Sequence, residues 1–157
     1  MPKEGVARGG RAGGLPEWLV ERMRKNPVCM MVTTAATGPR ARPMTAVRLT
    51  GKRTLLFVSS TNSRKLADIQ GNKGGCLTFA GDGWWACVTG EFSIRALSDS
   101  EIAAFACDWE TPGEEVVGLE FAVRAVEAWG AVGGPRELGL DPAASTEENS
   151  ENIRRIR

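Results

Sequence analysis

The sequence contains no histidine and no tyrosine among its 157 residues. Without histidine, Ser/His/Asp and Cys/His nucleophile arrangements, histidine-ligated haem and nearly every zinc site are excluded, except a zinc site built from cysteine and carboxylates. Without tyrosine, proton transfer is left to carboxylates, lysine and cysteine. We therefore expect no metal site, the sequence identifies no catalytic residue, and demanding chemistry would depend on a bound cofactor.

Long apolar runs are also absent. No segment approaches the length needed to cross a bilayer, and the N-terminus lacks the apolar core of a secretory signal. The net charge is only +1, which argues against a broad nucleic-acid-binding surface. The four cysteines show no C-x-x-C spacing and are expected to be free thiols. We expect a soluble intracellular protein, cytoplasmic unless its N-terminal segment directs it to an organelle.

The chain has the size of a single domain and can enclose an apolar core. Residues 1–14 are Gly-rich, basic overall and without apolar periodicity, which predicts a flexible tail. Residues 131–157 are rich in Gly, Pro, Ala and acidic residues and are interpreted as a second flexible tail. The folded domain is therefore expected to span residues 15–130.

Apolar periodicity and turn residues predict the elements of this domain. Helices are expected at 15–25 and 98–109, with a short helix that begins at Asn62 or Ser63 and ends at Gly71 in a left-handed conformation. Strands are expected at 28–35, 40–49, 54–60, 74–80, 84–96 and 119–129. These six short antiparallel strands are best closed into a small barrel, so the predicted class is mainly β with a few short helices.

Single residues refine this prediction. Pro43 has no N–H to donate, so its strand should lie at a sheet edge or a bulge. Strand 28–35 is apolar on both faces, which indicates a buried strand. Trp84 continues the core face of its strand, whereas Trp85 lies on the polar face. In the last strand, alternation predicts one shared face for Leu119, Phe121, Val123 and Ala125.

Residues 60–72 (STNSRKLADIQGN) place Arg64 and Lys65 in the first turn of the predicted helix. The helix dipole disfavours cations there by up to about 1 kcal/mol each. A bound anion would reverse that effect, because free backbone N–H groups, the Ser63 hydroxyl and two cations form a cradle for phosphate. The alternative interpretation is that both cations are solvated and tolerated.

A second basic segment favours the phosphate interpretation. Arg40, Arg42 and Arg48 share one face of the predicted strand 40–49. Three arginines on one strand face are not expected to point into a core, so they face water or an anion. Arg42 beside the short helix would help to surround a phosphate.

Four motifs, VTTAATGPRARPM, LLFVSSTNSRKLADIQGN, CVTGEFSI and VRAVEAWG, occur in an order that resembles a known family. The chain resembles the pyridoxamine 5'-phosphate oxidase-like superfamily of FMN-binding split barrels, and within it the short general stress protein 26-type members. The resemblance spans about residues 15–130. It implies a Greek-key split β-barrel and a homodimer that holds FMN in clefts between its subunits. A phosphorylated flavin-like cofactor such as a deazaflavin is the alternative to FMN.

Carried over by motif, the resemblance implies cofactor contacts in four places. Residues 42–47 would run along the flavin and ribityl chain, and the end of strand 54–60 would contact the ring or ribityl chain. The start of the short helix would take the phosphate, and tryptophans could cover the ring. The expected contact residues are Arg42, Pro43, Met44, Thr45, Val47, Val58, Ser59, Ser63, Arg64, Lys65, Trp85 and Trp129.

The chain also departs from true pyridoxamine phosphate oxidases. Trp85 stands where those enzymes carry Gln, and their C-terminal Arg/His-containing substrate segment is missing. We therefore expect a flavin-dependent oxidoreductase with another substrate, whose electron donor and acceptor the sequence does not specify. The first alternative is a non-catalytic flavin-binding stress or sensor protein. A barrel that binds single-stranded nucleic acid would need aromatic residues among its arginines, and residues 40–52 contain none.

Overall fold

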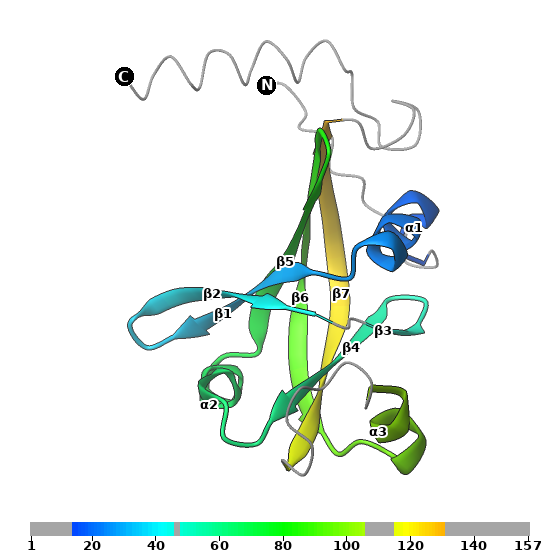
Figure 1. Ribbon diagram of the computed structural model, residues 1–157. Coiled ribbons are helices and arrows are strands. Elements are labelled where there is room, and N and C mark those ends of the chain that lie inside the picture. Colours follow the sequence, from blue (N-terminus) through cyan, green and yellow to red (C-terminus); the bar gives the residue numbers. More distant parts are fainter. Residues whose placement is uncertain (1–13, 46–47, 106–114, 131–157) are drawn as a thin grey trace.

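The computed structural model describes residues 14–45, 48–105 and 115–130. These residues form one antiparallel β-sheet with three short helices (Figure 1). Apart from Gly14, both predicted tails lie outside the described residues. No helix in these ranges is long and apolar enough to cross a membrane.

The elements follow one another in the order α1, β1, β2, β3, β4, α2, β5, β6, α3 and β7. The helices are α1 (Glu17–Lys25), α2 (Arg64–Gly71) and α3 (Asp99–Phe105). The strands are β1 (Cys29–Ala35), β2 (Gly38–Met44), β3 (Arg48–Gly51), β4 (Thr54–Ser60), β5 (Gly74–Gly81), β6 (Trp84–Arg95) and β7 (Val116–Gly130). They form a single sheet in the order β2-β1-β5-β6-β7-β4-β3.

The predicted class, mainly β with a few short helices, is confirmed, but the sheet has seven strands where six were expected. The predicted strand 40–49 is divided, because β2 pairs with β1 at one end of the sheet and β3 pairs with β4 at the other. Pro43 lies in β2, whose outer side is a sheet edge, as its missing N–H predicts.

The two edge strands lie at opposite ends of the strand order but close together in the chain. Three residues separate Met44 from Arg48, so their Cα atoms are at most about 14 Å apart. The sheet must therefore curve strongly until its edges approach each other. No ladder joins β2 to β3 among the described residues, so closure into a barrel stays a prediction.

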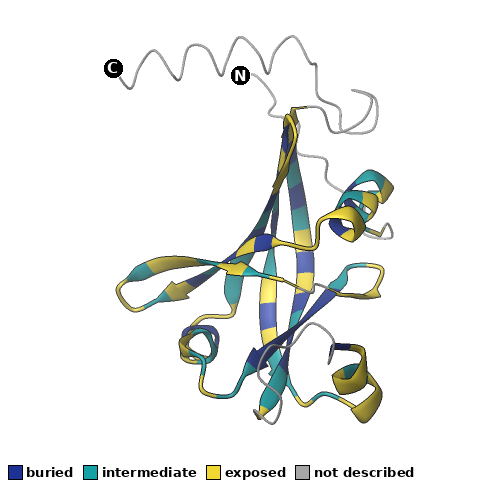
Figure 2. Ribbon diagram, in the orientation of Figure 1, coloured by how far each residue is buried: buried dark blue, intermediate teal, exposed yellow. Residues whose placement is uncertain are grey.

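One apolar cluster fills the inner face of the curved sheet, and buried residues alternate with more exposed ones along β1 and most of β6, whereas β4 is buried on both faces (Figure 2). Helix α1 contributes Leu19 and Met23, and Trp18 of α1 packs edge-on against Trp84 with ring centroids 6.1 Å apart. A smaller cluster beneath α3 contains Leu56, Val58 and Phe105. The largest fully buried members of the main cluster are Phe57, Phe92, Phe121, Leu19, Met31, Leu55, Leu77 and Leu119.

The prediction that the first strand is buried on both faces is wrong. Cys29 and Met31 are buried, but Met30 between them is 38% exposed. The outward side chains of β1 lie on the outer face of the sheet, described below.

The prediction that Leu119, Phe121, Val123 and Ala125 share one buried face of the last strand is wrong for Ala125. The register between β6 and β7 passes from Ala125 to Val123, which leaves Arg124 outside the pairing. Such a β-bulge inserts one residue and inverts the alternation on its far side. Val126 and Ala128 are therefore buried in place of Ala125.

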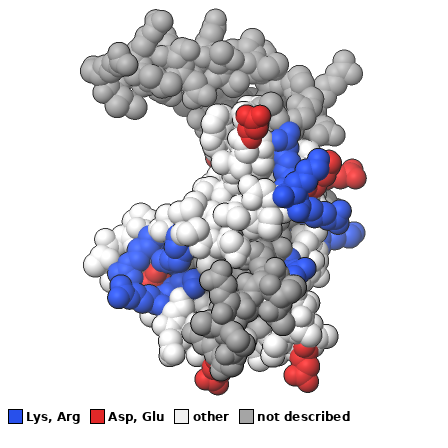
Figure 3. Space-filling model, in the orientation of Figure 1, with Lys and Arg blue, Asp and Glu red and all other residues white. Residues whose placement is uncertain are grey.

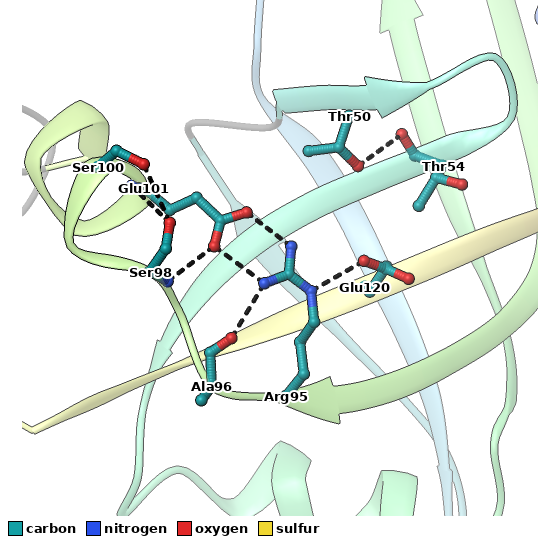
Figure 4. A network of polar contacts seen from close by, with 8 residues as sticks. All are labelled: Thr50, Thr54, Arg95, Ala96, Ser98, Ser100, Glu101 and Glu120. Atoms are coloured by element: carbon teal, nitrogen blue, oxygen red, sulfur yellow. Dashed lines mark hydrogen bonds and ion pairs between the residues drawn. The ribbon is translucent and has the colours of Figure 1, made fainter.

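Helix α3 is attached to the sheet through Arg95 (Figure 4). The guanidinium donates from Nη2 to Glu101 Oε1 at 2.7 Å and from Nε to Glu120 Oε2 at 2.9 Å. Ser98 and Glu101 form a capping box, with Ser98 N to Glu101 Oε2 at 2.9 Å and Glu101 N to Ser98 Oγ at 3.2 Å. These bonds from Arg95 and Ser98 lower the pKa of Glu101 to about 2.

Candidate functional site

Basic side chains gather around acidic atoms on the side of the molecule where β2 and α2 lie (Figure 3). On β2, Arg40 and Arg42 stand opposite Thr33 and Met31 of β1. Paired residues of an antiparallel ladder project to the same face, and both Thr33 and Met31 are buried. The two arginines therefore reach over the inner face of the sheet to Asp68 of α2.

Arg42, Thr33 and Asp68 form a closed set of hydrogen bonds. Arg42 donates from Nη1 to Thr33 Oγ1 at 2.9 Å and from Nη2 to Asp68 Oδ2 at 3.2 Å. The Thr33 hydroxyl donates in turn to Asp68 Oδ2 at 2.9 Å. Arg40 adds an ion pair, with 3.6 Å between its Nη1 and Asp68 Oδ1. Side chains from β1, β2 and α2 are thereby fixed relative to one another.

The Asp68 side chain is only 6% exposed, yet it remains charged. Burial raises the pKa of its carboxyl, but the hydrogen bond from Thr33 and the charges of Arg40 and Arg42 outweigh burial and lower the pKa overall. Asp68 is therefore ionised at neutral pH and partly neutralises the two arginines.

Lys65 is half-buried beside this cluster. Its Nζ donates to Ser63 Oγ at 2.7 Å and to Ser59 Oγ at 3.0 Å. Burial lowers the pKa of Lys65, and the positive charge of Arg42 lowers it further. Both hydrogen-bond partners are neutral hydroxyls, and no carboxylate in the described ranges lies within ion-pair distance. Among the described residues, Lys65 is thus a partly desolvated cation that lies beside another cation without a counter-ion of its own.

Helix α2 begins at Arg64 with Ser63 at the N-cap, as the sequence predicts. The Ser63 hydroxyl makes no capping bond to the helix, and its oxygen accepts a hydrogen bond from Lys65. Within the described part of the chain, no backbone carbonyl accepts the N–H of Arg64 or Lys65. Two N–H groups at the positive end of the helix dipole are therefore available to an anion. The Arg64 side chain is exposed.

The other expected contacts on residues 42–47 lie in different surroundings. Pro43 and Thr45 are exposed. Met44 is half-buried and packs against the main apolar cluster. Val47 lies outside the described residues. Of the described residues 42–45, only Arg42 contacts the cluster around Asp68.

The remaining expected contacts divide between two faces. Ser59 lies beside Lys65, whereas Val58 points to the opposite side of β4 and belongs to the small cluster beneath α3. Trp85 and Trp129 stand directly opposite each other on β6 and β7 and are 53% and 40% exposed. Trp84 is buried, as its place on the core face predicts.

Two assignments made from the sequence are wrong at this site. Arg48 does not join Arg40 and Arg42, because it lies on β3, where it donates to Ala104 O at 2.7 Å. Gly71 remains within α2 and is not left-handed, and the chain continues through Asn72 in an extended conformation.

Sequence reasoning missed Thr33 and Asp68. Asp68 follows Lys65 by three positions, which places both on one side of a helix. Thr33 is a polar residue on the face of β1 that also carries Cys29 and Met31. Neither signal identifies the other partner, because Thr33 and Asp68 are 35 residues apart in the sequence.

The arrangement can bind and orient an anion. Burial raises the pKa of the Cys29 thiol to about 12. Burial, together with Cys76 and Glu127, raises that of Cys87 to about 11, so both thiols are neutral at pH 7. No group of three or more Cys, Asp or Glu side chains in the described ranges could hold a metal ion.

No curated protein matches this sequence. Solved structures share its fold, among them HupZ of Group A Streptococcus, at 18% identity and a TM-score of 0.60 over 76% of this chain and 97% of that chain. A Clostridium acetobutylicum protein related to general stress protein 26 of B. subtilis gives 16% identity and a TM-score of 0.56, covering 73% and 87% of the two chains. A pyridoxamine 5'-phosphate oxidase-related, FMN binding protein from Nostoc punctiforme gives 15% and 0.56, covering 78% and 89%. At these identities the likeness establishes the fold alone.

The family is established by the sequence. Residues 16–103 match the model of a family described as "Pyridoxamine 5'-phosphate oxidase like". The match covers more than half of the chain and includes all residues of the cluster around Asp68. The chain therefore belongs to the pyridoxamine 5'-phosphate oxidase-like family.

Proposed function

We propose that the protein binds FMN and holds its phosphate at the start of α2, between Arg42, Arg64 and Lys65. The observation that carries this proposal is the half-buried Lys65, which lies beside Arg42 with two hydroxyls as its only described polar partners. Like charges in a partly desolvated setting repel each other. A phosphate between them would replace that repulsion with charge-assisted hydrogen bonds.

The charges of the site fit a phosphate monoester. Arg40, Arg42, Arg64 and Lys65 contribute positive charge, and among the described residues Asp68 is the one carboxylate in contact with this cluster. A phosphate monoester carries between one and a half and about two negative charges at pH 7. The N–H groups of Arg64 and Lys65 add donors of the kind that helix termini offer to phosphate. A phosphorylated deazaflavin would fit the same cradle, and the mass of the released ligand distinguishes the two.

We further propose a homodimer formed through the outer face of the sheet. Towards the end of the sheet that carries Trp85 and Trp129, the outward residues of β1, β5, β6 and β7 are small, apolar or uncharged except for Glu127. Neighbours in register include Met30, Val32, Cys76, Thr78, Cys87, Thr89, Trp85 and Trp129. Contiguous exposed surfaces of this kind are typical of protein interfaces. In such a dimer the exposed Trp85 and Trp129 would be available to a flavin held in a cleft between the subunits.

The activity proposed for the FMN-bound protein is that of a flavin-dependent oxidoreductase. The flavin would supply the redox step, which suits a chain without histidine or tyrosine. The chain's own residues would bind the phosphate, orient the ring and restrict access to it. Because Trp85 stands where true pyridoxamine phosphate oxidases carry Gln, we propose a substrate other than pyridoxamine phosphate.

A second candidate is a flavin-binding protein without turnover. It is favoured by the exposed Trp85–Trp129 pair, since two indoles against an isoalloxazine would quench and cover the ring. Reduction by NADPH or dithionite, followed by aerobic reoxidation with and without acceptors, separates the two candidates. Absence of NAD(P)H-driven reduction would favour the binding protein.

The binding proposal is tested with the full-length protein. We expect a flavin absorption spectrum or, after removal of bound ligand, uptake of FMN in titration calorimetry. Riboflavin, which lacks the phosphate, should bind at least about tenfold more weakly. A colourless protein that takes up no FMN, or equal affinities for FMN and riboflavin, would refute the phosphate cradle.

A further inference from the structure

Asp68 is a buried carboxylate inside a cluster that is proposed to bind an anion. Its side chain is 6% exposed and lies on α2, the helix that also carries Arg64 and Lys65. A negative charge at this place repels an incoming phosphate. Its presence therefore requires a reason other than direct attraction of the ligand.

The hydrogen bonds around Asp68 supply that reason. Arg42 uses one N–H from each Nη, one to Thr33 and one to Asp68, and a guanidinium has five N–H groups in a fixed plane. The plane is therefore held at two points, while its other N–H groups remain for a ligand. Arginine otherwise loses considerable rotamer freedom when it binds an anion, and a preordered guanidinium has already lost it.

Thr33 completes the arrangement from the opposite strand. Its hydroxyl accepts from Arg42 and donates to Asp68, so its one proton and an oxygen lone pair are both used. Thr33 is 1% exposed, and β1 holds it in register with Arg40 of the edge strand β2. Each of the three residues is hydrogen-bonded to the other two, so the position of the Arg42 guanidinium depends on both Thr33 and Asp68.

We propose that Asp68 is a positioning residue, which holds Arg42 through a direct ion pair and through Thr33 in the orientation needed to bind a phosphate. The inference rests on the proposed FMN site and assigns a role to residues outside direct contact with the ligand. Charge alone predicts that removing the negative charge of Asp68 strengthens phosphate binding, whereas a positioning role predicts that it weakens phosphate binding.

The decisive variants are Asp68→Asn and Thr33→Val, each close in shape to the residue it replaces. Positioning predicts that either substitution lowers FMN affinity by about tenfold and leaves riboflavin affinity within about twofold. If Asp68 acts only by charge, Asp68→Asn should instead raise FMN affinity and Thr33→Val should leave it unchanged. That result would overturn the proposal. Parallel losses of FMN and riboflavin affinity would also overturn it, because they would indicate a general structural role.

A second measurement on the flavin-free protein separates this inference from the FMN proposal. Nitrogen-15 NMR of arginine side chains resolves distinct Nη signals for a guanidinium whose rotation is hindered. We expect resolved signals for Arg42 in the wild type and merged signals in Asp68→Asn and Thr33→Val. That result supports positioning even if the wild type takes up no FMN. Merged Arg42 signals in the wild type would overturn the positioning role, whatever the flavin titrations show.

Discussion

The guanidinium of Arg42 and the carboxylate of Asp68 form a 3.2 Å ion pair between β2 and α2, across 26 residues of sequence. This contact joins the edge strand of the sheet to the helix that carries Lys65. The cationic cluster therefore depends on the tertiary fold, and its members have different surroundings and different expected roles.

Replacement of Lys65 by alanine should weaken FMN binding by about 10- to 100-fold, because one charge-assisted hydrogen bond to a partly buried cation is lost. Arg64→Ala should cost only a few-fold, since an exposed charge interacts through solvent. Titration calorimetry with FMN measures both values. Equal losses for the two variants would contradict the difference in burial.

The same variants provide a stability control. Because burial and Arg42 lower the pKa of Lys65, its charged form is disfavoured in the ligand-free fold. Lys65→Ala should therefore leave the melting temperature unchanged or raise it. Lys52→Ala, at an exposed position in the turn between β3 and β4, serves as the matched control and should change neither affinity nor stability.

FMN affinity should depend on pH through the phosphate on the acidic side and through Lys65 on the alkaline side. The affinity should rise between about pH 5 and 7 as the phosphate loses its second proton, whose pKa is about 6. At alkaline pH it should fall earlier than an ordinary lysine allows, since the pKa of Lys65 lies below its usual value and the neutral amine no longer attracts phosphate. Lys65→Arg keeps its charge, so its affinity should not fall over that alkaline range. If FMN affinity varied with pH in the same way in the wild type and in Lys65→Arg, Lys65 would not be a phosphate ligand.

Much of the fold was predictable because its signals are local. Alternation in β6 correctly placed Trp84 inside and Trp85 outside, and Pro43 correctly indicated an edge strand. The sequence predicts Asn62 or Ser63 as the N-cap of α2, and Ser63 occupies that position.

The errors arise where distant segments decide the outcome. The bulge at Arg124 depends on how β7 pairs with β6. The predicted strand 40–49 is divided because its first half pairs with β1 and its second half pairs with β4. The same holds for the site, where the sequence indicated Arg42 and Lys65 but not Asp68. An acidic residue in a helix is ordinary until the fold brings an edge strand against it.

The outer face of the sheet should be the dimer interface. Met30→Arg places a charge at a position that is 38% exposed, and burying that charge in an interface without a partner is costly. We expect this variant to be monomeric in analytical ultracentrifugation while its far-ultraviolet circular dichroism stays unchanged. Ile102→Arg, at an apolar residue of α3 that is 43% exposed, should remain dimeric. A dimeric Met30→Arg variant would exclude this face.

Glu101→Gln should reduce stability at neutral pH and make it less sensitive to acid. Glu101 accepts two hydrogen bonds from Arg95 and one from the Ser98 N–H, and these contacts lower its pKa from 4.5 to about 2 (Figure 4). A carboxyl whose pKa is depressed on folding contributes stability above its unfolded pKa and loses it as the pH falls towards its folded pKa. The contribution of Glu101 should therefore be complete above about pH 4.5 and disappear between about pH 4.5 and 2.

Thermal melts of wild type and Glu101→Gln from pH 7 to pH 3 test this window. The difference in melting temperature should be constant above about pH 5 and shrink below pH 4.5, because the unfolded wild-type chain then binds a proton at Glu101 that the folded protein does not. Glu21→Gln is the matched control, since its ion pair with Lys25 is 65% and 75% exposed and should contribute little at any pH. A difference that does not vary with pH would mean that the Glu101 carboxylate stabilises α3 through its shape and not through its charge.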